Sequence, residues 1–150
     1  MDPSGHVVTL YPLSVEGAIV PPGYDAAQFV GNFEEQLVKQ LRKKGLNVQP
    51  PTGPIAEGMQ IRGRLVQIKA GSSAAWFMFG LIGALLSGGG SIFEVEGAIG
   101  DPQAAYGQFH ETGRMSYGSF RGKNERGIKM AAVLAGSRTS KSILKILKGR

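Results

Sequence analysis

Apolar side chains at four-residue spacing mark the first well-defined element of the chain. Phe29, Phe33, Leu37 and Leu41 form a stripe that predicts an amphipathic helix over residues 25–44. Asp25 and Gln28 have the spacing of a capping box, which satisfies free backbone N–H groups at a helix start. Gly45 can adopt a positive φ and end the helix.

A second helical pattern closes the chain, over residues 124–148, with Asn124 as its predicted N-cap. One face carries small or apolar side chains, namely Ile128, Ala131, Ala132, Ala135, Thr139, Ile143 and Ile146. The other face carries a basic stripe at three- and four-residue spacing, made of Arg138, Lys141, Lys145 and Lys148.

Alternating apolar and polar residues predict strands at 59–69, 92–99 and 106–117, and shorter strands at 7–13 and 46–48. The alternation changes phase at Leu65-Val66, which predicts a β-bulge. No helix separates the three long strands, so we expect an antiparallel meander. The sequence thus predicts one α+β domain over 1–150, with an antiparallel sheet of about four or five strands and both helices on one face.

An uncharged run, Ala74 to Leu86, interrupts this pattern between two strands and leads into Gly88-Gly89-Gly90. As a helix it would be about 20 Å long, too short for the ~30 Å apolar core of a bilayer. We therefore predict that this run is a long apolar, glycine-rich hairpin insertion. Two interpretations stay open: burial within the domain, or exposure to an identical subunit, another protein or the membrane interface. In the second, the contact residues are Trp76, Phe77, Phe79 and Leu81.

Charge is distributed unevenly. The net charge is +6, but residues 114–150 hold ten basic groups and one acid, which gives +9, and residues 1–113 hold seven basic groups and ten acids, which gives −3. The basic helix suits an anionic membrane surface or, ranked lower, a nucleic acid. The alternative is an ordinary solvated helix face.

Candidate chemistry is sparse. The chain has no cysteine, so it holds no disulfide or cysteine metal site. His110 and Glu111 are adjacent on a predicted strand and point to opposite faces, so they cannot readily share a ligand. The triple glycine lacks the Lys-Ser/Thr and the helix of a phosphate loop. We therefore expect no catalytic residues, no cofactor and no metal, and predict that the chain is not an enzyme.

Short motifs across most of the chain resemble one bacterial family. They are GRLVQI at 63–68, GSSAA at 71–75, YGQF at 106–109 and GSFRG at 118–122, with KKGLNV at 43–48 after the first helix. The order of these motifs along the chain resembles that in the family known as domain of unknown function 4410. This resemblance implies an exported, often lipid-anchored protein without an assigned activity, in the periplasm or at the outer membrane. The lipid-accepting cysteine of the family is missing, and the apolar passage is longer.

No signal peptide is expected in this sequence, because its first residues lack a basic segment followed by an apolar one. The chain is then either cytosolic or the mature portion of an exported protein. The leading interpretation is an envelope-associated, non-enzymatic interaction protein that binds an unknown protein partner or itself through residues 74–86. The alternative is binding to an anionic membrane surface or nucleic acid through the basic C-terminal helix.

Overall fold

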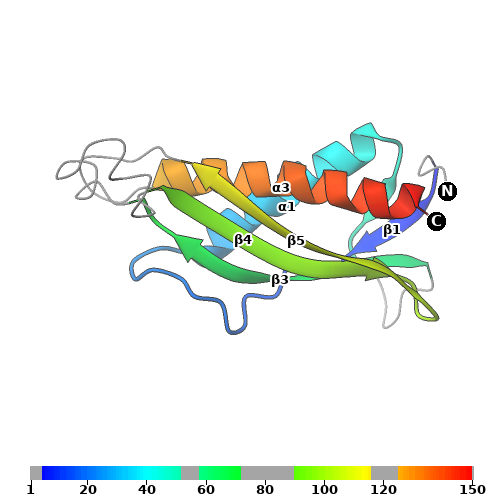
Figure 1. Ribbon diagram of the computed structural model, residues 1–150, viewed down its shortest axis with the longest axis horizontal. Helices are drawn as coiled ribbons and strands as arrows, with labels where there is room; N and C mark the ends of the chain where they lie inside the picture. The colour runs from blue at the N-terminus through cyan, green and yellow to red at the C-terminus, as the bar shows by residue number, and fades with distance from the viewer. Residues whose placement is uncertain (1–4, 52–57, 72–89, 116–124, 150) are drawn as a thin grey trace.

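Two helices cover one face of a five-stranded sheet (Figure 1). The computed structural model describes residues 5–51, 58–71, 90–115 and 125–149. The sheet order is β2-β1-β3-β4-β5. The elements in chain order are β1 (Val7–Leu10), α1 (Ala26–Lys43), β2 (Asn47–Gln49), β3 (Met59–Lys69), β4 (Ser91–Gly100), β5 (Ala105–Met115) and α3 (Glu125–Lys148). The predicted α+β class, strand number and one-sided helices are confirmed.

The sheet is mixed, whereas the sequence predicted an antiparallel one. Strands β3, β4 and β5 form the expected antiparallel meander. Strand β1, however, runs parallel to both β2 and β3. The reason is the position of α1 between β1 and β2, because a helical crossover returns the chain to the same end of the sheet and makes the two strands parallel.

The predicted strand 7–13 ends early, at Leu10, but the chain continues along the edge of β3. The Tyr11 N–H donates to the Ile61 carbonyl at 3.0 Å, and the Ser14 N–H donates to the Gly63 carbonyl at 3.0 Å. Pro12 has no N–H to donate, so regular pairing stops there.

Helix α1 matches its prediction closely. The Asp25 carboxylate accepts from the Ala27 N–H at 3.1 Å, and Gly45 after the helix has φ +96°. The whole predicted stripe is buried, together with Val30. The Phe33 ring stacks on Phe93 of β4, with the ring centroids 5.5 Å apart. The core therefore lies between the helices and the sheet.

Helix α3 lies across β5 and β4 and beside α1 (Figure 1). Every residue of its predicted inner face is buried except Ile146, which is half-buried, and Leu147 is fully buried in addition. Two glycines allow the close approach. A Cβ on Gly113 of β5 would lie 1.9 Å from the Ala131 carbonyl oxygen, and one on Gly136 would lie 2.8 Å from the Phe33 carbonyl oxygen.

The bulge predicted at Leu65-Val66 is present, since the register of β3 against β4 shifts between Leu65 and Gln67. Strand β3 ends at Lys69, and its antiparallel partner β4 begins at Ser91. The apolar run 74–86 therefore belongs to the connection of this hairpin, as predicted, but it lies outside the described residues.

Of the helices that the structure describes, neither has the length and apolar character required to cross a bilayer.

Candidate functional site

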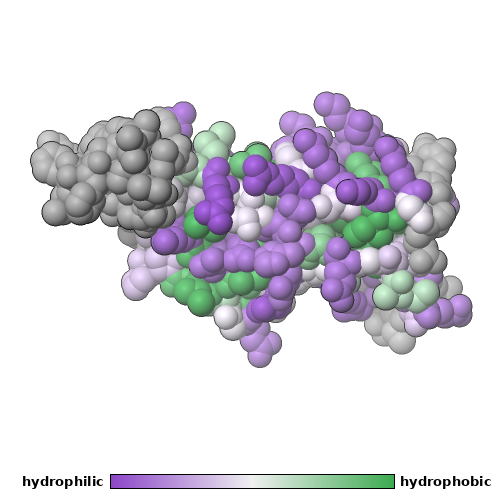
Figure 2. Space-filling view, in the orientation of Figure 1, coloured by the Kyte–Doolittle hydropathy of each residue, from purple (hydrophilic) through white to green (hydrophobic). Residues whose placement is uncertain are grey.

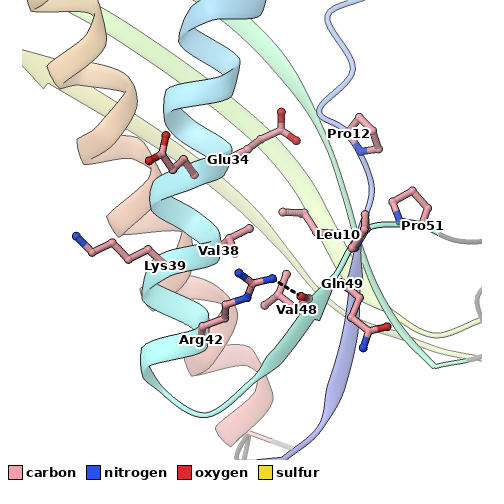
Figure 3. Close-up of a pocket in the computed structure, with 11 residues that line it drawn as sticks. Leu10, Pro12, Glu34, Val38, Lys39, Arg42, Val48, Gln49 and Pro51 are labelled. Carbon is pink, nitrogen blue, oxygen red and sulfur yellow. Dashed lines mark hydrogen bonds between the residues drawn. The ribbon is translucent and has the colours of Figure 1, made fainter.

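A groove of about 670 Å³ runs between α1 and the parallel strands β1 and β2 (Figure 3). Pockets of this size hold small ligands or a few side chains. Its lining is apolar along the floor and charged along the rim, and consists of Leu10, Pro12, Glu34, Glu35, Val38, Lys39, Arg42, Val48, Gln49, Pro50 and Pro51.

Prolines explain why the groove exists. Strand β2 ends at Gln49, immediately before Pro50-Pro51, and β1 ends two residues before Pro12. Proline cannot donate a backbone hydrogen bond, so both parallel strands stop while α1 continues past them. Leu10 and Val38 are consequently only half-buried. The carboxyl ends of the two strands thus leave an apolar hollow under the helix.

Charged groups of both signs border the hollow, and all of them come from α1. Arg42 donates to the Val48 carbonyl at 3.0 Å and ties the end of the helix to β2 (Figure 3). Glu34 lies further along the helix. Burial raises the pKa of the Glu34 carboxyl above its ordinary value, and a hydrogen bond from the Leu13 backbone opposes this only in part. The groove therefore suits apolar side chains and penalises a buried negative charge.

We predict that Glu34→Gln raises the melting temperature at pH 7. Because the pKa of Glu34 is raised in the folded state, its stabilising contribution is present below pH 4.5 and is lost as pH rises through the higher folded-state value. The gain should therefore vanish at about pH 3, where the Glu34 carboxyl is protonated in both the folded and the unfolded state. Thermal unfolding followed by circular dichroism measures it. Glu35→Gln, at an exposed position on the same helix, is the control. An equal gain in both variants would contradict burial of Glu34.

The face of the sheet turned away from the helices carries a ladder of polar pairs. Arg64 pairs with Glu96 at 2.5 Å, and Gln67 donates to Glu94 at 2.8 Å. Glu94 also pairs with His110. Burial raises the pKa of Glu94, but hydrogen bonds from His110 and Gln67 and the charge of Arg114 outweigh it, so the pKa lies below its ordinary value.

His110 and Glu111 point to opposite faces, as predicted. Glu111 accepts from Ser142 on α3, whereas His110 meets Glu94 on the outer face. The pairing of His110 with Glu94 could not be predicted from the sequence, because the two residues lie on different strands and the pattern alone does not fix the register between them. Within the described ranges, no hydroxyl is hydrogen-bonded to His110, and no three His, Cys, Asp or Glu residues group as metal ligands.

One of the four residues in the basic stripe of α3 is hydrogen-bonded to the sheet. Lys141, Lys145 and Lys148 are exposed, as predicted. Arg138 instead donates to the Thr112 carbonyl of the edge strand β5 at 2.6 Å, so it fastens the helix to the sheet. The other predicted contact residues, Trp76, Phe77, Phe79 and Leu81, lie outside the described part of the chain.

Comparison with known proteins identifies other proteins with a similar fold. No model of a known protein family matches the sequence, and no curated protein matches it significantly. A Xanthomonas campestris protein of the domain of unknown function 330 family has a TM-score of 0.58 at 10% identity, over 95% of this chain and 84% of that one. PelC from Paraburkholderia phytofirmans, solved as a dodecamer, has a TM-score of 0.51 at 11% identity, over 93% and 92%.

A "putative lipoprotein" from Caulobacter crescentus has a TM-score of 0.50 at 12% identity, over 89% of this chain and 92% of that one. At such identities the likeness is one of fold. The fold therefore occurs in uncharacterised bacterial proteins and in one that was solved as a dodecamer.

Proposed function

We propose that this chain is a non-enzymatic protein of the bacterial envelope that works by self-association. The observation that carries the proposal is the apolar groove beside α1, because a half-exposed apolar hollow is the kind of surface that a partner covers. Two further facts support it. The same fold occurs in the PelC dodecamer and in the Caulobacter lipoprotein candidate, and the sequence motifs resemble the lipoprotein-like family of domain of unknown function 4410.

The proposed occupant of the groove is the apolar run 74–86 of a second copy. This run offers Trp76, Phe77, Phe79 and Leu81 without any charge. The groove has an apolar floor and room for a few such side chains. Because groove and run are different parts of the chain, the contact is heterologous, and repetition of such a contact closes into a ring when the rotation allows.

A second candidate function rests on the exposed lysines of α3. Lys141, Lys145 and Lys148 have no ion-pair partner among the residues that the structure describes. They would attract an anionic surface, as the sequence predicted.

Self-association predicts that Phe77→Ser/Phe79→Ser, and separately Val38→Lys in the groove, lower the mass of the particle in light scattering after gel filtration. Val38 is half-buried on α1, and lysine is a good helix former, so the fold should survive. Ile19→Ser is the control, because Ile19 is a 70% exposed apolar residue outside both surfaces. An unchanged mass in both test variants, or an equal loss in the control, would contradict the proposal.

A further inference from the structure

Helices α1 and α3 run in the same direction, so their carboxyl ends lie at one end of the molecule (Figure 1). The contact is fixed midway, where Gln36 donates to the Ser137 hydroxyl at 2.9 Å. Both helices finish in lysines. These are Lys43 and Lys44 at the end of α1, and Lys141, Lys145 and Lys148 in the last two turns of α3. We call these five residues the basic end.

Hydrophilic side chains lie over the upper side of this end, next to an apolar area (Figure 2). All five lysines are exposed, and none forms an ion pair within the described ranges. Asp101, in the turn between β4 and β5, accepts instead from the Tyr106 hydroxyl at 2.5 Å and from the Gln103 and Ala104 N–H groups at 2.8 Å. Lysines at a helix end are favoured by the helix dipole, but the dipole does not require two such ends to lie side by side.

The chain also enters the fold at this place. The Gly5 N–H donates to the Gly45 carbonyl at 2.8 Å, so the first described residue lies next to the last turn of α1 and Lys44. Residues Lys69 and Ser91, from which the apolar connection leaves, lie at the opposite end of the long strands (Figure 1). The molecule thus has a basic end, and the connection between β3 and β4 leaves from the opposite end.

We propose that the basic end binds the anionic phospholipid headgroups of a membrane. This rests on the proposed envelope location and deepens it, because it adds an orientation. Lysine side chains near an anionic bilayer contribute nearly additively to binding. With the basic end on the headgroups, the ends of β3 and β4 from which the apolar connection leaves face away from the membrane.

Co-sedimentation with vesicles tests this. The chain should bind vesicles of phosphatidylcholine with about a quarter phosphatidylglycerol, should not bind pure phosphatidylcholine, and should be released between about 50 and 300 mM salt. Lys43→Glu/Lys44→Glu and Lys141→Glu/Lys145→Glu should each lower the partition constant by at least about tenfold. The variant at Lys43 and Lys44 is the more informative of the two, because these residues of α1 are not part of the basic stripe on α3 that the sequence predicts.

Lys69→Glu/Arg114→Glu is the matched control, because it makes the same charge change at exposed positions of the other end. An equal loss in the control would mean that net charge alone drives binding and would overturn the inference. Absent or salt-independent vesicle binding would also overturn it, as would tighter binding to a DNA duplex at the same salt. A chain that assembles but ignores vesicles refutes only this inference; one that binds vesicles as a monomer refutes only the proposed assembly.

Discussion

Replacing Gly113 with alanine is expected to lower the free energy of unfolding by about 3 kcal/mol. The added methyl group would lie 1.9 Å from the Ala131 carbonyl oxygen and 2.8 Å from the Ala135 nitrogen. Both are backbone atoms of α3, so no side-chain rotation relieves the clash. Helix α3 must lift from β5, and its buried apolar face loses contacts. Unfolding in urea, followed by circular dichroism, measures the loss.

Gly31→Ala is the matched control for Gly113→Ala. Gly31 lies inside α1, and a Cβ there has no atom within 4 Å. Alanine should therefore stabilise the protein by up to about 1 kcal/mol through its higher helix propensity. If Gly113→Ala were as well tolerated as Gly31→Ala, α3 would not pack on β5 as closely as the structure has it.

Truncating Phe93 to alanine is expected to cost about 3–5 kcal/mol. Phe93 is completely buried near the start of β4, and its ring stacks on Phe33 of α1. Deletion removes a ring contact between helix and sheet and leaves a cavity. Because domains are stable by only about 5–15 kcal/mol, this loss should remove a large fraction of the free energy of unfolding.

The same urea titration measures the effect of Phe93→Ala, with Met130→Ala as its control. Met130 is 43% exposed on α3, so its truncation should change the free energy by about 0.5 kcal/mol or less. Similar losses in the two variants would argue that Phe93 is not a core residue.

The regular elements were predictable because each repeats a pattern over many residues. The stripe from Phe29 to Leu41 fixes both the position and the buried face of α1. The alternation along 59–69 defined β3 at its exact bounds, and its change of phase located the bulge at Leu65-Val66. Local sequence is sufficient in these cases, since amphipathic burial acts within the element itself.

The rest depends on distant contacts. Strands β1 and β2 have four and three residues, which carry too little pattern to decide between parallel and antiparallel pairing. The groove arises only because those strands stop under α1. The pairing of Glu94 with His110, and of Arg138 with the Thr112 carbonyl, follows from register and helix placement. The convergence of Lys43 and Lys145 at one end likewise requires the parallel arrangement of two helices.

Mixing two variants that should each fail to assemble alone tests heterologous self-association most directly. Phe77→Ser/Phe79→Ser keeps an intact groove, and Val38→Lys keeps an intact apolar run. Each alone should sediment as a monomer of about 15.9 kDa. An equimolar mixture contains one complete groove-and-run contact per pair and should form a dimer that grows no further. A mixture that stays monomeric, or either variant that still forms large particles alone, would contradict this mode of assembly.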